Sequence, residues 1–245
     1  MNPNLLFAKL PFLYSIRKER CEMILKYFET APDWLADYFK IEYLPPNTVF
    51  VSEGAPAGYV YLIADGIVKA TDYRILGIEF DFMHFDKVYA FGGMEVLMKL
   101  PEYRTTLTTV TDCNMVRIPR DQYETWLLHD LDAMKLEAHL ACEYLLEQAR
   151  LARAYLFLQG ADRLAMLLVT KYEKYAKDGV YYARSNRRSL ANEAGLSIKT
   201  TSRSIKQLAD DGLITPYERA LSVTQEQFLR LKERIGKIMD CNELH

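Results

Sequence analysis

The sequence predicts an α+β protein built from a small β-sandwich or barrel, one long helix, and a compact helical domain that carries a β-hairpin. Three observations predict this order. Residues 41–120 are rich in β-branched and aromatic residues and are divided by Gly and Pro turn signals, residues 131–155 contain no Pro and no Gly, and shorter helical patterns follow them. We therefore divide the chain into residues 1–130, 131–158 and 159–245.

The composition is that of an ordinary globular protein without a strong overall charge. The 245 residues are 50% hydrophobic and 26% charged, with a net charge of −2, which excludes a disordered or collagen-like chain. Because the whole chain is not a polycation, any nucleic-acid surface must be local. No apolar run approaches the roughly 18–20 residues of a membrane span, so we expect a cytoplasmic protein without membrane contact.

Reactive side chains show no catalytic or metal-binding arrangement. The four cysteines are far apart and form no CxxC pair, so we expect neither a disulfide framework nor a zinc or iron–sulfur site. The histidines show no metal-ligand spacing, and there is no HExxH motif, Walker loop or nucleophile–base pair. The sequence therefore predicts no metal, no cofactor and no enzymatic activity.

The first 120 residues predict helices followed by short strands. Apolar residues recur with helical spacing from Ser15 to Glu29, and Pro32 opens a second short helix. Beyond residue 40, alternating runs lie between regularly spaced turn residues, as in a small β-sandwich or barrel. Asp65 and Gly66 stand between two such runs, which is typical of a β-hairpin.

The predicted long helix carries a heptad pattern about three heptads long. Its apolar and small residues form a seam, which we expect to join two copies of the chain as a homodimer through Leu131–Tyr155. Charged flanking residues such as Lys135 and Glu137 favour this interpretation, and an amphipathic helix packed on its own domain is the alternative. The seam consists of Met134, Ala138, Ala141, Leu145, Gln148, Ala152 and Tyr155.

Positive charge is concentrated in one segment. Residues 184–206 contain six basic residues and one acidic residue, Glu193, which gives +5 and leaves −7 for the rest of the chain. A local basic surface of this kind is what nucleic-acid binding requires.

The same segment predicts a helix-turn-helix, within SNRRSLANEAGLSIKTTSRSIKQLADDGLI. Asn186 can cap a first helix that ends at Ala194, Gly195 supplies the positive φ of the turn, and Ser197 caps a second helix. Leu213 then begins a hairpin that turns near Arg219, and a terminal helix follows. We interpret the hairpin as a wing beside the two helices.

The exposed face of the second helix fits the major groove of DNA. Arg203 suits a bidentate contact to guanine, whereas Arg187, Ser197, Thr200 and Lys206 suit phosphates. In a dimer, the operator should be an inverted repeat in double-stranded DNA. A basic, solvated face on a helical hairpin is the alternative. The predicted DNA-binding residues are Arg187, Ser197, Lys199, Thr200, Ser202, Arg203 and Lys206.

Together with the run FGGMEVLMKLPEYRTT at residues 91–106, these features resemble the Crp/Fnr family of bacterial transcription regulators over roughly residues 40–240. The resemblance implies a jelly-roll-like β-roll sensor, a dimerisation helix, a winged helix-turn-helix, a small-molecule effector and RNA polymerase as a partner. The run itself is similar to the family's phosphate-binding cassette, in which glycines, a helix N-terminus and an Arg hold an anion. The implied effector-pocket residues are Gly92, Gly93, Met94, Glu95, Arg104, Thr105 and Gln148.

The chain departs from the cyclic-nucleotide binders of this family. Met94 stands where they have a Glu for the ribose, and we expect Glu95, one residue later, to point elsewhere. Gln148 and Ala149 occupy the positions from which the dimer helix meets the base. The recognition helix also differs, with Ile198 and Lys199 in place of Arg and Glu.

We therefore predict a homodimeric, sequence-specific DNA-binding regulator whose physiological effector is not cyclic AMP. A true cyclic-AMP-responsive activator is one alternative. Another is a pocket filled by side chains such as Met94, which needs no ligand. A third is a ligand-binding module whose winged helix mediates protein contacts; it would show no salt-dependent binding to bulk DNA.

Overall fold

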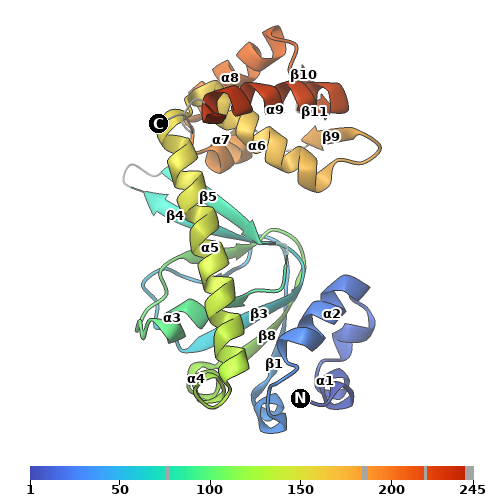
Figure 1. The fold of residues 1–245 in the computed structure, drawn as a ribbon, viewed down its shortest axis with the longest axis vertical. Coiled ribbons are helices and arrows are strands. Elements are labelled where there is room, and N and C mark those ends of the chain that lie inside the picture. Colours follow the sequence, from blue (N-terminus) through green and yellow to red (C-terminus); the bar gives the residue numbers. More distant parts are fainter. Residues whose placement is uncertain (75–77, 86, 184–186, 218–219, 241–245) are drawn as a thin grey trace. The chain divides into compact units, whose positions relative to one another are not determined.

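The computed structural model divides into two compact units (Figure 1). The described residues are 1–74, 78–85, 87–183, 187–217 and 220–240. The first unit comprises Met1–Asp72 and Met83–Leu146, and the second comprises Tyr73–Phe82 and Glu147–His245. Among the described residues, no helix has the length and apolar character needed to cross a membrane.

Short helices open the first unit, as predicted. Their apolar side chains, Leu6, Ile24 and Phe28 among them, are buried and pack around Trp126. The segment after Pro32 forms a 3-10 helix instead of an α-helix. These elements are α1 (Pro3–Lys9), η1 (Pro11–Tyr14), α2 (Lys18–Tyr27) and η2 (Asp33–Tyr38).

Two four-stranded sheets form a β-roll. The strand orders are β1-β8-β3-β6 and β2-β7-β4-β5. Strand β3 lies antiparallel to β8, and this register places the buried Leu62 opposite the buried Val116. The strands are β1 (Lys40–Leu44), β2 (Val49–Val51), β3 (Tyr59–Asp65), β4 (Val68–Arg74), β5 (Ile78–Phe85), β6 (Ala90–Phe91), β7 (Thr106–Thr109) and β8 (Cys113–Pro119).

The hairpin predicted at Asp65-Gly66 is wrong. Strands β3 and β4 belong to different sheets, so the chain crosses from one sheet to the other at this point. Gly66 has a φ of 99°, and a Cβ there would overlap the carbonyl oxygen of Asp112 and the side chain of Cys113. The glycine is needed for this close crossing, not for a two-residue hairpin turn.

The long helix α5 (Leu131–Phe157) has nearly the predicted bounds, but its contacts differ from those expected of the seam. Met134 packs on the hydrophobic core of the first unit, and Ala141 lines a cavity in that unit. Glu137, predicted as a charged flank, is only 4% exposed. In this half of the helix, part of the predicted seam is therefore used within the chain's own domain. The side chains of Ala152 and Tyr155 lie outside the described residues.

The second unit is a winged helix domain, as predicted. Buried Leu164, Leu168, Leu208, Val223 and Leu231 form its core. Three strands pair in the order β10-β11-β9. Strand β9 was not predicted. Asn186 and Arg219, the predicted cap and turn residues, lie outside the described residues, as does Arg184. The elements are α6 (Gly160–Tyr175), β9 (Val180–Ala183), α7 (Arg187–Ala194), α8 (Ile198–Asp210), β10 (Thr215–Pro216), β11 (Leu221–Thr224) and α9 (Gln225–Asp240).

Candidate nucleic-acid interface and effector cavity

The turn between α7 and α8 has the geometry predicted from its glycine and serine. Gly195 has a φ of 62°, and the amide of Leu196 donates to the carbonyl of Ala191 at 2.9 Å. Ser197 caps α8, since its side chain accepts a hydrogen bond from the amide of Thr200 at 3.1 Å. The cap satisfies one of the free amides at the helix N-terminus and fixes where α8 begins.

The helical period of α8 separates a buried face from a basic face. Thr201, Ser204 and Leu208 are buried, whereas the predicted DNA-binding residues lie on the other side. Lys199, Arg203, Lys206, Arg187 and Ser197 are exposed, and Thr200 and Ser202 are partly exposed. The structure therefore brings all seven together around one exposed helix.

Two contacts within this surface were not predicted. The Nη1 of Arg187 donates to the Oγ of Ser202 at 3.3 Å, which links the first turn of α7 to α8. A Cβ at Gly160 would meet the methyl group of Thr200 and the Oγ of Ser204. The small residue at the start of α6 thus lets that helix approach α8 closely.

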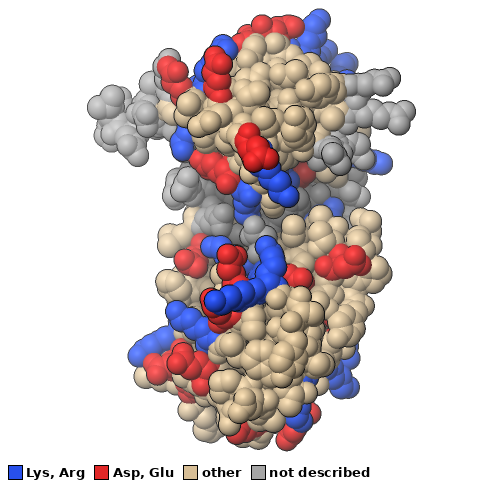
Figure 2. Space-filling view, turned by 90° about the vertical axis from the view of Figure 1, so that its right-hand side faces the viewer, with Lys and Arg blue, Asp and Glu red and all other residues tan. Residues whose placement is uncertain are grey.

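The one acidic residue of the basic segment lies inside the domain. Glu193 on α7 forms a buried ion pair with Lys171 on α6; their side chains are 7% and 14% exposed. The Oγ of Ser189 also donates to the carboxylate. Because this negative charge faces inward, it does not offset the exposed Lys and Arg side chains. On the face drawn in Figure 2, by contrast, acidic and basic side chains are mixed.

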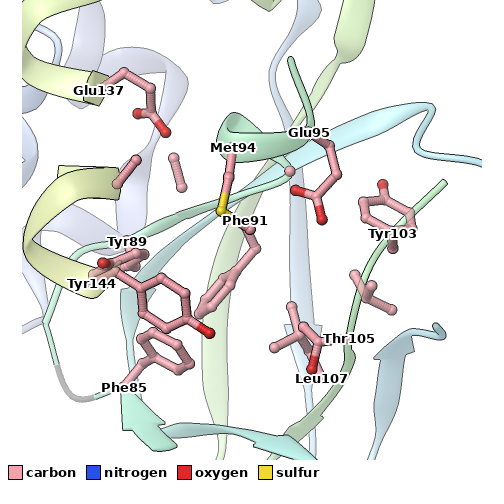
Figure 3. A pocket seen from close by; sticks show the side chains of 14 residues that line it. Phe85, Tyr89, Phe91, Met94, Glu95, Tyr103, Thr105, Leu107, Glu137 and Tyr144 are labelled. Carbon is pink, nitrogen blue, oxygen red and sulfur yellow. The ribbon is translucent and has the colours of Figure 1, made fainter. Parts of the chain in front are cut away.

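The first unit contains a cavity of about 60 Å³ beside α3 (Gly93–Leu97), shown in Figure 3. Aromatic side chains dominate it, and Glu95 and Glu137 are its charged residues. Within the described part of the chain, none of the lining residues is Lys, Arg or His. The cavity is lined by Val51, Phe85, Tyr89, Ala90, Phe91, Gly92, Met94, Glu95, Tyr103, Thr105, Leu107, Glu137, Ala141 and Tyr144.

Glu95 lines this cavity, so the expectation that it points elsewhere is wrong. Helix α3 has only five residues and starts after Gly92, whose φ of 99° sets its direction. The Glu95 Oε1 accepts a hydrogen bond from the amide of Arg104 at 3.2 Å. The Nη2 of Arg120 donates to the Glu95 carbonyl at 3.1 Å and holds the end of the helix. These contacts turn Glu95 inward and leave it 5% exposed.

Three predicted pocket residues do not line the cavity. The side chain of Arg104, expected to bind a phosphate, is exposed. Gly93 is buried against Glu137, whose carboxylate occupies the space of a Cβ. Gln148 lies farther along α5. Gly92, Met94, Glu95 and Thr105 do line the cavity.

A buried hydrogen-bond cluster supports the cavity. The Oε2 of Glu137 accepts bonds from the hydroxyls of Tyr123 on α4 (Arg120–His129) and Tyr27 on α2, at 2.7 Å and 3.0 Å. Burial raises the pKa of Glu137 above its usual value, although these two hydrogen bonds lower it in part. The cluster joins α2, α4 and α5 around one carboxylate.

Sequence reasoning missed most of the aromatic lining. Rings of Phe85, Tyr89, Phe91 and Tyr144 pack against one another at centroid distances of 4.7–6.3 Å. One signal was present on α5, where Glu137, Ala141 and Tyr144 are spaced four and three apart and share a face. The strand residues gave no such signal, because alternation does not show which face encloses a cavity.

Comparisons with known proteins agree with both units. Residues 41–130 match the cyclic nucleotide-binding domain family, and residues 162–232 match the Crp-like helix-turn-helix domain family. No curated protein matches the sequence.

Solved structures of similar fold include three regulators. The c-di-GMP-responsive global regulator CLP of Xanthomonas campestris has 21% identity and a TM-score of 0.68, covering 85% of this chain and 99% of its own. FixK2 of Bradyrhizobium japonicum has 19% identity and a TM-score of 0.61, with coverages of 79% and 96%. A Crp/Fnr-family transcriptional regulator of Thermus thermophilus has 18% identity and a TM-score of 0.66, with coverages of 79% and 98%.

A cyclic-nucleotide-binding-like β-roll followed by a winged helix-turn-helix defines a DNA-binding transcription regulator. The chain belongs to the Crp/Fnr family.

Proposed function

We propose that this regulator binds an inverted-repeat operator as a homodimer, with α8 of each copy in a major groove, and that a small-molecule effector in the β-roll modulates this binding. The observation that carries the proposal is the exposed basic face of α8, since Lys199, Arg203 and Lys206 project from it while Glu193 is turned inward. DNA as the partner places the site of action in the cytoplasm. RNA polymerase is the partner through which such binding would alter transcription.

The surface of α5 supports a dimer seam in a register different from the predicted one. Ala138, Cys142, Leu145 and Ala149 are spaced 4, 3 and 4 apart and are exposed or partly exposed; the Leu145 side chain is 52% exposed. This stripe replaces Met134 and Ala141, which pack within their own unit. A stripe of this spacing fits a two-helix seam.

Operator selection from random duplexes tests the DNA-binding proposal. We expect an inverted repeat with half-sites about one helical turn apart, bound with an affinity that falls steeply as salt rises. Fluorescence anisotropy against the selected and a scrambled duplex would measure both. Equal affinity for the two duplexes, or no salt-dependent binding at all, would instead support a winged helix that contacts protein.

Two variants test the dimer seam. Leu145→Lys places a charge on the stripe and should give monomers at micromolar concentration in sedimentation. Leu128→Lys is the matched control, because Leu128 is also well exposed but lies on α4. In the dimer, mild oxidation should cross-link the exposed Cys142 of the two copies, and Cys142→Ser should abolish the cross-link. A stable Leu145→Lys dimer would refute a seam through α5, and a dimer whose Cys142 side chains do not cross-link would refute this register.

A further inference from the structure

The cavity in the β-roll differs in charge from a site that holds a phosphate. Its charged lining residues are the carboxylates of Glu95 and Glu137, and no basic side chain is among the described residues that line it. Arg104, whose guanidinium would be needed to pair with a phosphate, is exposed to solvent. An anion placed here would face negative charge without a compensating cation in a poorly hydrated site.

The rest of the lining suits a small cation with an apolar body. Phe85, Phe91 and Tyr144 line the same cavity as Glu95 (Figure 3). Aromatic faces attract ammonium groups electrostatically, and more strongly where water is excluded. Burial raises the pKa of Tyr144 and of Tyr103 to about 12, so both hydroxyls remain neutral and add no further negative charge at neutral pH.

One lining group has an unused hydrogen-bonding capacity. Within the described part of the chain, the buried Oγ1 of Thr105 has no hydrogen-bond partner, although it belongs to a residue that lines the cavity. Buried polar atoms are normally paired. An N–H donor of a bound molecule would satisfy this oxygen.

The size of the cavity limits the ligand further. A water-sized group needs about 10–15 Å³ of such space, so a cavity of about 60 Å³ holds roughly four to six of them. This is far smaller than a cyclic nucleotide. It matches a short branched aliphatic amine.

We propose that the effector of this regulator is a small aliphatic ammonium compound, whose cation is held by Glu95 and whose apolar body packs among the aromatic rings. This inference rests on the proposed effector-responsive function. Glu95 is the binding carboxylate, because the Oε2 of Glu137 is already engaged by two tyrosine hydroxyls.

An isosteric series of probes tests the proposal by calorimetry at pH 7. Isobutylamine, isobutanol and isobutyrate have nearly the same shape and carry positive, zero and negative charge. We expect isobutylamine to bind at least about 10-fold more tightly than isobutanol, because a hydrogen bond to a charged group is the stronger one. We expect no detectable binding of isobutyrate or cyclic AMP.

Variants then assign the charge preference to one residue. Glu95→Gln keeps an acceptor for the Arg104 amide but removes the charge, so it should weaken isobutylamine binding by about 10-fold or more and leave isobutanol binding nearly unchanged. Glu102→Gln is the matched control, since Glu102 is exposed on the loop that follows α3. It should bind all probes as the unmodified protein does.

The outcomes separate this inference from the proposed function. Tighter binding of isobutyrate or cyclic AMP, isobutylamine affinity that survives Glu95→Gln, or the absence of any probe binding would each overturn the ligand class. Operator binding by ligand-free protein, measured in parallel, would show in those cases that the DNA-binding proposal still holds. Loss of operator binding under every condition would overturn the proposed function instead.

Discussion

Glu137 in the first unit and Glu193 in the second are both buried carboxylates, and the two are stabilised in different ways. Glu193 in the DNA-binding unit is paired with Lys171, a cation from the neighbouring helix. Glu137 on α5 in the first unit accepts hydrogen bonds from two tyrosine hydroxyls, and burial raises its pKa. A buried ion is stable only when its partner stays in place, whereas a buried carboxylate held by hydroxyls can take up a proton. The comparison predicts that Glu193 is sensitive to loss of its partner and Glu137 to pH.

Glu193→Ala should give the largest effect. It leaves the ammonium of Lys171 buried without its partner, and removing one member of a buried pair costs about 3–5 kcal/mol. Urea unfolding, followed by a probe in the C-terminal domain, would measure this loss.

The exposed pair of the same domain provides the control. Glu173 and Lys232 lie 2.9 Å apart with side chains 49% and 60% exposed, so Glu173→Ala should cost about 1 kcal/mol or less. Similar losses for the two variants would contradict the view that burial makes the Glu193 pair sensitive.

The two arginines Arg203 and Arg187 on the basic surface should differ in how they contact DNA. Arg203 projects from the middle of α8, whereas Arg187 lies at the start of α7 and contacts Ser202. We expect Arg203→Ala to cost about 1–3 kcal/mol per half-site and to relax the preference at one base position.

Arg187→Ala is the matched comparison for that variant. It should weaken binding to the selected and scrambled duplexes about equally and reduce the salt slope by about one per contact. Anisotropy over a salt series measures both quantities. If Arg203→Ala weakened both duplexes equally, Arg203 would be a phosphate contact and its assignment to a base would be wrong.

The geometry of the exposed basic face of α8 could be predicted because its signals are local. Gly195 sets the turn through its positive φ, and the side chain of Ser197 fixes the start of α8 by capping the amide of Thr200, three residues later. The helical period of 3.6 residues then determines which side chains of α8 are exposed. None of these steps depends on distant residues. The inward position of Glu193 was not predicted, since it depends on Lys171 of the neighbouring α6.

The cavity could not be predicted in this way because distant contacts determine it. Asp65-Gly66 indicates a turn but does not show which strands pair. The chain crosses between the two sheets there and does not form the predicted hairpin. The direction of Glu95 depends on the amide of Arg104 and on Arg120. A heptad pattern on α5 likewise does not reveal whether Met134 faces its own domain or a second copy.

The last and smallest effect concerns Glu137, and it is a dependence on pH. In the unfolded chain a glutamate loses its proton near 4.5, whereas burial keeps Glu137 protonated to higher pH in the folded protein. Between these two pKa values the folded state binds more protons than the unfolded state, so the contribution of Glu137 to stability is present below pH 4.5 and is lost as the pH rises through the folded pKa.

Glu137→Gln keeps an oxygen that can accept bonds from Tyr27 and Tyr123 but cannot ionise. We therefore expect the stability of the variant relative to the unmodified protein to increase from pH 5 to pH 8 in urea unfolding. Asp132→Asn, at an exposed position on the same helix, should show no such trend, and a Glu137→Gln difference that is constant with pH would show that this carboxylate is held in one protonation state across the range.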